Sequence, residues 1–319
     1  FVGNLGYAAV ALSGGLLAIR GTITIGDIQA FIQYVKNFTQ PMQQIAQVLN
    51  QVQSMAAASE RVFAFLEEEE EVPTEHPIAL PEQIAGTVSF QHVSFGYQPE
   101  QQIIHDFSAD VHSGQKIAIV GPTGAGKTTM VKLLMRFYDV NSGAILLDGH
   151  NVKDFERHDL RKAFGMVLQD TWLFQGTIME NIRYGRLDAT DEEVIAAAKA
   201  AHADSFIRQL PDGYQMELNE DASNVSQGQK QLLTIARAIL ADNRVMILDE
   251  ATANIDTETE LLIQDSLEKM KNIGTMLIVA HRLSTIQHAD NIILLSHGQI
   301  QEQGTHQELL HRRGRYYQL

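Results

Sequence analysis

The chain has 319 residues, enough for two domains, and 45% of them are hydrophobic, enough for a substantial core. It contains no cysteine, which excludes disulfides, thiolate metal sites and a catalytic thiol. The formal net charge of −15 argues against broad electrostatic binding of nucleic acid, so no nucleic-acid partner is expected.

The first apolar segment, residues 1–19, carries no charged side chain. Its length is close to the roughly 20 residues with which an α-helix crosses a bilayer, and this predicts a membrane helix. A buried helix of a soluble domain is the alternative. No charged region precedes the segment, so a signal peptide is not expected. The chain begins at Phe1 without a methionine, which indicates a fragment of a longer protein.

A second long helical pattern covers residues 28–66, with apolar side chains every three or four positions and mostly glutamines on the other face. A helix surrounded by lipid would not carry so many amides, whereas a helix that lines a wet cavity between other helices could. A soluble amphipathic helix or coiled coil is the alternative. We expect residues 1–66 to form an all-α transmembrane segment.

A charged and proline-containing stretch follows, and it predicts a linker over residues 67–85. Five consecutive glutamates, Glu67 to Glu71, are typical of a solvated segment, and Pro73, Pro77 and Pro81 extend it. The second domain is then expected to cover residues 86–319. Its apolar runs predict strands at 88–95, 117–120, 144–147, 163–168, 245–248, 275–280 and 292–295. Helical patterns between these runs, and a helix-rich stretch over 171–240, indicate an α/β domain with a mainly parallel sheet and a helical subdomain.

A complete phosphate-binding motif, G-x-x-x-x-G-K-T, follows the apolar run 117–120 and opens a helical pattern that continues to Phe137. Glycines allow backbone N–H groups to turn around an anion, and the helix N-terminus adds its positive end. Lys127 can reach the β- and γ-phosphates, and the Thr128 hydroxyl can ligate Mg²⁺, so ATP and Mg²⁺ are the expected cofactors. A glycine-rich turn without a ligand is the alternative. The predicted nucleotide-binding residues here are Gly121, Pro122, Thr123, Gly124, Ala125, Gly126, Lys127, Thr128 and Thr129.

The apolar run 245–248 ends in two adjacent carboxylates, Asp249 and Glu250. At the C-terminal end of a strand the backbone can turn both side chains toward the nucleotide. Asp249 is placed to hold Mg²⁺ through water, and Glu250 to polarise an attacking water as a general base. An ordinary strand end with solvated acids is the alternative.

The peptide from Asn224 to Gln231, N-V-S-Q-G-Q-K-Q, resembles the signature peptide of ATP-binding-cassette (ABC) proteins. Its position shortly before the Asp249-Glu250 strand is also similar. Residues 1–66 resemble the last transmembrane helices of an exporter-type half-transporter, and residues from about 86 onward resemble its nucleotide-binding domain. The resemblance implies a P-loop NTPase domain with a small antiparallel β part. It also implies a multi-pass protein of the cell membrane whose nucleotide-binding domain is cytoplasmic.

This resemblance assigns roles to further residues. Tyr97 matches the aromatic residue that stacks on adenine, and Gln169 matches the glutamine that senses Mg²⁺ and the attacking water. His281 matches the switch histidine near the γ-phosphate, so Glu250, His281 and Gln169 form the predicted catalytic set, with Thr128, Gln169 and Asp249 as the metal set.

Other positions correspond to contacts with a second copy of the domain. Ser226, Gln227, Gly228 and Gln229 correspond to the signature that faces the partner's ATP, and Asp256 to the loop that crosses to the partner domain. Glu220 resembles the acidic residue of the exporter-specific loop before the signature. That loop lacks its usual glycines, with Asn219 and Ala222 instead.

The signature departs from the usual Leu-Ser-Gly-Gly-Gln, because Val225 and Gln227 replace the leucine and the first glycine. Gln227 adds bulk where the partner's γ-phosphate is expected. This variant resembles that of some bacterial heterodimeric exporters in which one composite site is weak.

The resemblance implies ATP-driven export of a hydrophobic or amphiphilic substrate by two half-transporters within membrane lipid. It leaves the substrate itself open, and also whether the partner is an identical chain. Two other functions stay open from the sequence. One is a soluble ATPase of the same superfamily that acts in DNA repair or on the ribosome, and the other is a nucleotide-switched regulator.

Overall fold

The computed structural model describes residues 2–98, 100–168, 171–249, 255–270, 274–280 and 286–318, with side chains described from residue 5 onward. The predicted catalytic residues Gln169, Glu250 and His281 lie outside these ranges. The chain divides into two compact units, Phe1–Val72 and Pro73–Leu319.

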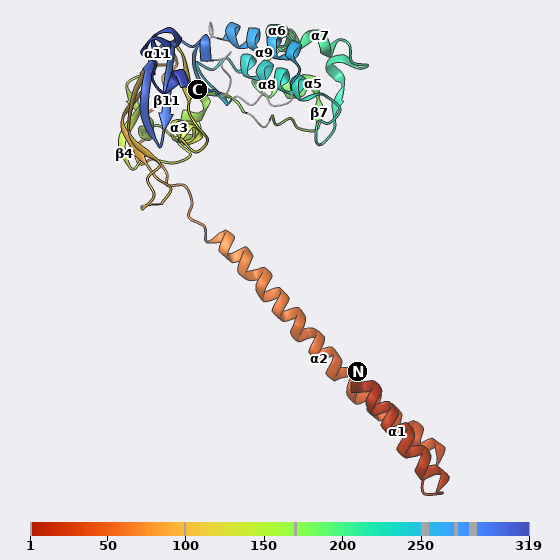
Figure 1. The fold of residues 1–319 in the computed structure, drawn as a ribbon. Helices are drawn as coiled ribbons and strands as arrows, with labels where there is room; N and C mark the ends of the chain where they lie inside the picture. The colour runs from red at the N-terminus through yellow and green to blue at the C-terminus, as the bar shows by residue number, and fades with distance from the viewer. Residues whose placement is uncertain are drawn as a thin grey trace. The chain divides into compact units, whose positions relative to one another are not determined.

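The first unit is a helical hairpin of α1 (Val2–Ile19) and α2 (Ile25–Leu66) (Figure 1). Thr24 caps α2 by exchanging hydrogen bonds with Asp27: its hydroxyl accepts from the Asp27 N–H, and the Asp27 carboxylate accepts from the Thr24 N–H. The helices run antiparallel: a Cβ on Gly14 would lie 3.0 Å from the Ile28 side chain, and one on Gly6 would lie 3.5 Å from Val35. Two glycines eight residues apart therefore share one helix face and allow close approach of the backbones.

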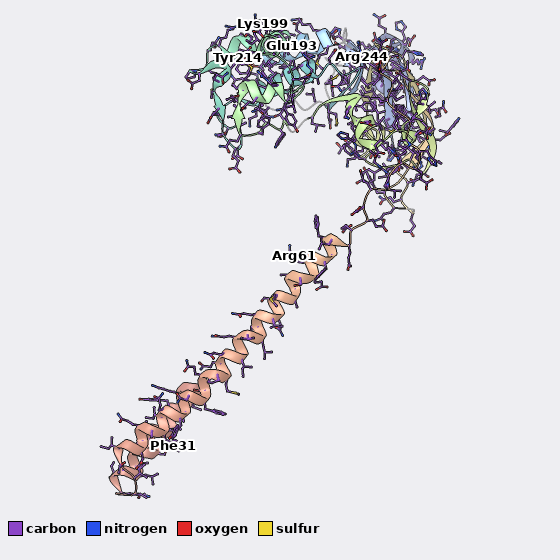
Figure 2. The ribbon with its side chains drawn as sticks, turned by 180° about the vertical axis from the view of Figure 1, so that it is seen from behind. Phe31, Arg61, Glu193, Lys199, Tyr214 and Arg244 are labelled. Carbon is purple, nitrogen blue, oxygen red and sulfur yellow. The ribbon has the colours of Figure 1, made fainter. Side chains whose placement is uncertain are left out.

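No side chain of α2 is buried, and apolar residues project from it along its length, as Phe31 does at 60% exposure (Figure 2). In the part of the chain that the structure describes, no helix has the combined length and hydropathy needed to cross a membrane. The two expected helices are present, and their place in a membrane stays a prediction.

The second unit is built on a six-stranded sheet of order β12-β11-β3-β10-β9-β6. Every neighbouring pair is parallel except β11 and β12, so the predicted mainly parallel sheet is confirmed. Its strands are β3 (Lys116–Val120), β6 (Phe164–Val167), β9 (Val245–Asp249), β10 (Thr275–Val279), β11 (Asn291–Ser296) and β12 (Gln299–Gly304).

A four-stranded antiparallel sheet, order β2-β1-β4-β5, forms the smaller β part of this unit. It contains β1 (Val88–Phe95), β2 (Ile104–Val111), β4 (Ser142–Leu147) and β5 (His150–Asn151). The sequence pattern does not predict β2. Asp106 has a φ of +49°, and an irregular register beside it interrupts the alternation of buried and exposed residues.

Helices cover the parallel sheet and extend beyond it. In Figure 1, α5 to α9 gather on one side of the unit, and α3, α11 and the antiparallel sheet lie on the other. The helices are α3 (Lys127–Leu134), α4 (Arg157–Lys162), α5 (Ile178–Arg183), α6 (Asp191–Ala200), α7 (Asp204–Ile207), α8 (Gln227–Ala241), α9 (Thr257–Met270) and α11 (His306–Arg312). Short elements are β7 (Gly176–Thr177), paired with β8 (Glu217–Leu218), and the 3₁₀ turns η1 (Val152–Asp154), η2 (Gly213–Gln215) and η3 (Tyr316–Gln318).

Two hydrophobic cores meet at the parallel sheet because successive side chains of a strand point to opposite faces. On β3, Ala118 and Val120 belong to the core shared with the helical subdomain, and Ile117 and Ile119 belong to the core shared with the antiparallel sheet. The central strand is thus buried on both faces, which explains its continuous apolar run.

The chain enters the second unit before its first strand. The Thr74 hydroxyl donates to the Phe155 carbonyl at 3.0 Å and accepts from the buried guanidinium of Arg136 at 3.1 Å. The Ile78 N–H donates to the Asp154 carbonyl at 2.9 Å, and the Ala85 N–H to the Asp148 carboxylate at 2.7 Å. Much of the predicted linker is therefore fastened to the second unit.

Candidate functional site: a nucleotide-binding loop

The phosphate-binding motif forms the connection between β3 and α3. Its first glycine, Gly121, passes so close to the β11–β12 hairpin that a Cβ would lie 2.0 Å from the Leu295 carbonyl oxygen. Gly126 has a φ of +103°, and a Cβ there would lie 2.6 Å from the Ile104 side chain. Only glycine fits these two positions. The hairpin also touches the loop through the Gly298 N–H, which donates to the Ala125 carbonyl at 3.0 Å.

Lys127 begins α3, and its side chain is turned back over the loop. The amine donates to the carbonyls of Gly121 at 2.7 Å and Pro122 at 3.0 Å, and only 6% of the residue is exposed. Burial lowers the pKa of the Lys127 amine, and the negative charge of Asp249 acts in the opposite direction. A buried amine surrounded by carbonyls and a helix N-terminus is placed to bind phosphate oxygens.

Asp249 ends β9, and the sheet order brings it toward the loop. The strands β3 and β9 lie on either side of β10 and run parallel to it, so their carboxyl ends share one edge of the sheet. The Thr128 hydroxyl and the Asp249 carboxylate are oxygen ligands of the kind that Mg²⁺ prefers. The described residues contain no group of three or more His, Asp or Glu able to hold a metal. Mg²⁺ in nucleotide sites needs only one or two protein ligands because phosphates and water supply the rest, so the residues fit this ion.

A hollow of 360 Å³ opens over the motif. Its lining consists of Ile103, Thr123, Gly124, Gly126, Lys127, Thr128 and Thr129. Ile103 was not a sequence candidate, because it lies outside any motif and reaches the loop only through the start of β2. A larger open hollow of 710 Å³ lies on the antiparallel sheet beside Ser89 and His112, but it has no glycine-rich loop or lysine.

Tyr97 lies two residues beyond β1 and is close to α3. Its hydroxyl is 3.5 Å from the Thr129 hydroxyl, and 44% of the residue is exposed. The structure therefore brings Tyr97 to the phosphate-binding loop, and its stacking on a base stays a prediction.

The signature peptide caps helix α8 in the helical subdomain. The Ser226 hydroxyl accepts from the Gln229 N–H at 3.2 Å, and the Gln229 side chain accepts from the Ser226 N–H at 2.9 Å. Gly228 is buried against α9, where a Cβ would lie 2.5 Å from the Thr259 side chain. The Gln227 amide donates to the Thr171 hydroxyl at 3.2 Å, so its side chain reaches the segment that follows Gln169.

Asp256 precedes α9 and caps it, with the Thr259 N–H donating to its carboxylate at 2.9 Å. Backbone and side-chain hydrogen bonds from Thr259 lower the pKa of Asp256. A capping role and a contact with a partner chain are compatible, because the cap uses only part of the carboxylate.

An α/β fold with this loop at the carboxyl edge of a parallel sheet defines a P-loop nucleotide-binding domain. Residues 104–253 match the family model described as "ABC transporter". Residues 104–253 thus belong to an ABC transporter ATP-binding domain, and the relatives of the chain include an ABC transporter ATP-binding/permease protein and a lipid A-core flippase.

Two relatives and one solved structure illustrate the similarity. The chain is 53% identical over its whole length to the "Fatty acid ABC transporter ATP-binding/permease protein" of Mycobacterium bovis, of which it covers 50%. It is 39% identical, again over its whole length, to the "ATP-dependent lipid A-core flippase" of Syntrophus aciditrophicus, of which it covers 53%. A structure titled "Structure of a bacterial Atm1-family ABC exporter with ATP bound" matches with a TM-score of 0.74 at 38% identity, over 93% of this chain and 52% of the other. The chain spans about half the length of the curated relatives it matches.

Proposed function

We propose that this chain is part of an ATP-driven exporter of a hydrophobic or amphiphilic substrate. In this proposal residues 1–66 end the membrane domain, residues 67–85 connect it, and residues 86–319 form the nucleotide-binding domain on the cytoplasmic side of the cell membrane. The similarity to a fatty acid transporter and to a lipid flippase covers the helical unit as well as the ATP-binding domain, and this supports the assignment.

The observation that carries the proposal is the loop at residues 121–129, with Lys127 buried on its own carbonyls and influenced by the charge of Asp249. Lys127 would bind the β- and γ-phosphates, and Tyr97 would stack on the adenine. Thr128, Asp249 and Gln169 would hold Mg²⁺, and its positive charge would offset the negative charge of the phosphates.

Hydrolysis is assigned to residues at the carboxyl ends of the strands. Glu250 follows Asp249 and would polarise the attacking water as the general base. His281 follows β10 and would contact the γ-phosphate, while Gln169 follows β6 and would orient the water. All three roles rest on the family resemblance and on the position of each residue in the sequence.

A second half-transporter is the proposed partner. Its Ser226 to Gln229 peptide would close over the ATP bound to this chain, and the loop with Asp256 would cross to it. Closure with ATP and separation after hydrolysis would move the attached helices, because ATP binds the closed state more tightly than the open one.

The two other functions are less well supported. A soluble ATPase acting on nucleic acid or the ribosome does not explain a helical unit shared over its full length with ATP-binding/permease relatives. A purely regulatory nucleotide switch does not need the retained Asp249-Glu250 pair.

The test uses the full-length protein in lipid vesicles, with wild type and Glu250→Gln compared. Wild type should hydrolyse Mg-ATP and move a fluorescent fatty acid or lipid across the bilayer. Glu250→Gln should bind ATP, lose about a hundredfold or more of its hydrolysis rate, and accumulate as an ATP-bound dimer. Hydrolysis by this variant at the wild-type rate would show that Glu250 is not the base. Hydrolysis by wild type without any lipid movement would argue for one of the two other functions.

A further inference from the structure

Tyr97 stands in an aromatic cluster that sequence motifs do not indicate. Phe95, the last residue of β1, meets the Tyr97 ring at a centroid distance of 5.0 Å and an angle of 84°. Tyr138, from the segment after α3, meets it at 5.0 Å and 81°. Tyr138 also lies 5.7 Å from Phe95, so the three rings touch one another.

A cation completes the surroundings of the ring. The Lys132 amine, on α3, lies 5.6 Å from the Tyr97 ring centroid, within the range of a cation–π interaction. Lys132, Tyr138 and Thr129 all come from the segment that begins with the phosphate-binding Lys127. One short segment therefore contacts both the phosphate site and the aromatic ring beside it.

These contacts are not those of an ordinary core. Tyr97 and Tyr138 are each 44% exposed, whereas Phe95 is 3% exposed. Edge-to-face pairs of this kind contribute about 0.5–1.5 kcal/mol beyond the area they bury. Two half-exposed rings with fixed mutual angles form a surface whose orientation is set before a ligand arrives, and this reduces the entropy lost on binding.

We propose that Tyr138, assisted by Lys132, is a positioning residue that holds the Tyr97 ring in the plane on which a purine base stacks. The inference rests on the proposed function, because it takes Tyr97 as the base-stacking residue. It adds that base recognition depends on the segment after α3, and that Tyr138 acts on the base and not on the phosphates.

The test compares ATP with inorganic tripolyphosphate, which has the phosphates but no base, by titration calorimetry on the full-length protein. Tyr138→Leu removes the ring and should weaken ATP binding about two- to tenfold, which corresponds to the energy of an edge-to-face pair. Tripolyphosphate binding should not change. Tyr138→Phe keeps the ring and should bind ATP like wild type.

Tyr184, directly after α5, offers a matched control. It is 55% exposed, faces Phe174 at 5.7 Å and 62°, and has the Arg237 guanidinium 5.4 Å from its ring. Tyr184→Leu should therefore change stability as Tyr138→Leu does and leave the affinity for ATP unchanged. Lys132→Met keeps most of the side-chain bulk and should weaken the binding of ATP, but not of tripolyphosphate, about twofold or more. This variant tests the inference even where Tyr138→Leu does not fold.

Unchanged ATP affinity in both Tyr138→Leu and Lys132→Met, or equal loss of ATP and tripolyphosphate, would overturn the inference. A wild-type protein that binds tripolyphosphate, and whose affinity for ATP is no higher despite the base, would overturn the inference as well. Failure of wild type to bind either ligand would instead contradict the proposed function, so the two failures are distinguishable.

Discussion

Lys127 is the residue on which the phosphate site depends most directly. Its amine is buried and forms two hydrogen bonds to carbonyls of its own loop. We predict that Lys127→Ala lowers the affinity for ATP about a hundredfold or more, because hydrogen bonds to charged groups contribute about 1.5–3 kcal/mol each and two phosphate contacts would be lost. Titration of ATP into the full-length variant measures this directly.

A lysine elsewhere on the domain serves as the control for that change. Lys162 is largely exposed and pairs with Asp159 at 2.8 Å on the surface of α4. Lys162→Ala should bind ATP like wild type, since exposed ion pairs contribute little. Normal ATP affinity in Lys127→Ala would contradict the role assigned to Lys127.

Gln227 is the residue whose effect is hardest to predict from sequence alone. Replacing it by glycine removes the bulk expected near the partner's γ-phosphate, and if the proposed exporter is a homodimer we predict a rise in ATP turnover. The capping pair Ser226 and Gln229 would remain, so α8 should still form. Steady-state ATPase assays of the variant check this, and a lower or equal rate would count against a weakened composite site.

The hydrogen bond from Gln227 to Thr171 provides the matching control. Thr171→Val removes that bond but keeps the bulk of Gln227, so its turnover should not rise. An increase in both variants would assign the effect to the released bond and not to the space.

At the scale of elements, the β11–β12 hairpin packs against the phosphate-binding loop and hydrogen-bonds to it. Its turn residue Gly298 has a φ of +72°, and a Cβ there would lie 1.8 Å from the Ile103 carbonyl oxygen. We predict that Gly298→Ala destabilises the domain by about 2–5 kcal/mol, from backbone strain together with the forced displacement of Ile103. ATP affinity should fall as well, because Ile103 lines the hollow over the loop.

Gly149, in the turn between β4 and β5, provides a control that separates backbone strain from steric displacement of a neighbour. Its φ is +82°, but a Cβ there would meet no atom within 4 Å. Gly149→Ala should therefore cost only about 1–2 kcal/mol and leave ATP affinity unchanged. Thermal unfolding and ATP titration of both variants make the comparison, and equal effects would show that the steric contact is unimportant.

The sequence predicts two kinds of element: strands that are buried on both faces, and segments that carry a motif. The runs at 117–120, 245–248, 275–280 and 292–295 correspond to β3, β9, β10 and β11, because central parallel strands are continuously apolar. The edge strand β12 is missed, since Gln299, Gln301 and Gln303 resemble a solvated loop. The helix after the loop ends at Leu134 and not near Phe137, because Arg136 takes a left-handed φ of +52° that no local pattern announces.

The same contrast holds for the site. The glycines, Lys127 and Asp249 are recognisable because their chemistry requires fixed residue types at fixed spacing. Ile103 and Tyr138 cannot be recognised from the sequence, since each reaches the site only through tertiary contacts that bring distant segments together. The roles of Gln169, Glu250 and His281 stay predictions.

At the scale of the whole molecule, the second unit begins at Pro73, earlier than the predicted boundary at residue 86. We predict that a fragment of residues 86–319 is less stable than one of residues 73–319 by about 3 kcal/mol. The shorter fragment lacks the partners of Arg136, Asp154 and Asp148, and each hydrogen bond contributes about 1 kcal/mol. Urea unfolding of the two fragments measures the difference.

A fragment of residues 72–319 is the control, because it adds only Val72, which is 72% exposed. It should match the 73–319 fragment in stability. Equal stability of all three fragments would mean that the contacts of Thr74 and Ile78 contribute nothing to the unit.

The strand β3, which the phosphate-binding loop follows, pairs with two strands that come much later in the sequence. β3 pairs with β10 and β11, and the hairpin that touches Gly121 and Ala125 ends the same sheet. When residue 129 leaves the ribosome, the loop therefore lacks the strands and the hairpin that contact it in the folded domain. About 170 more residues must emerge before residues 295 to 298 are available. The nascent chain should bind ATP only after this hairpin has emerged, and termination between residue 129 and the hairpin should leave a product that contains the full motif but no working site.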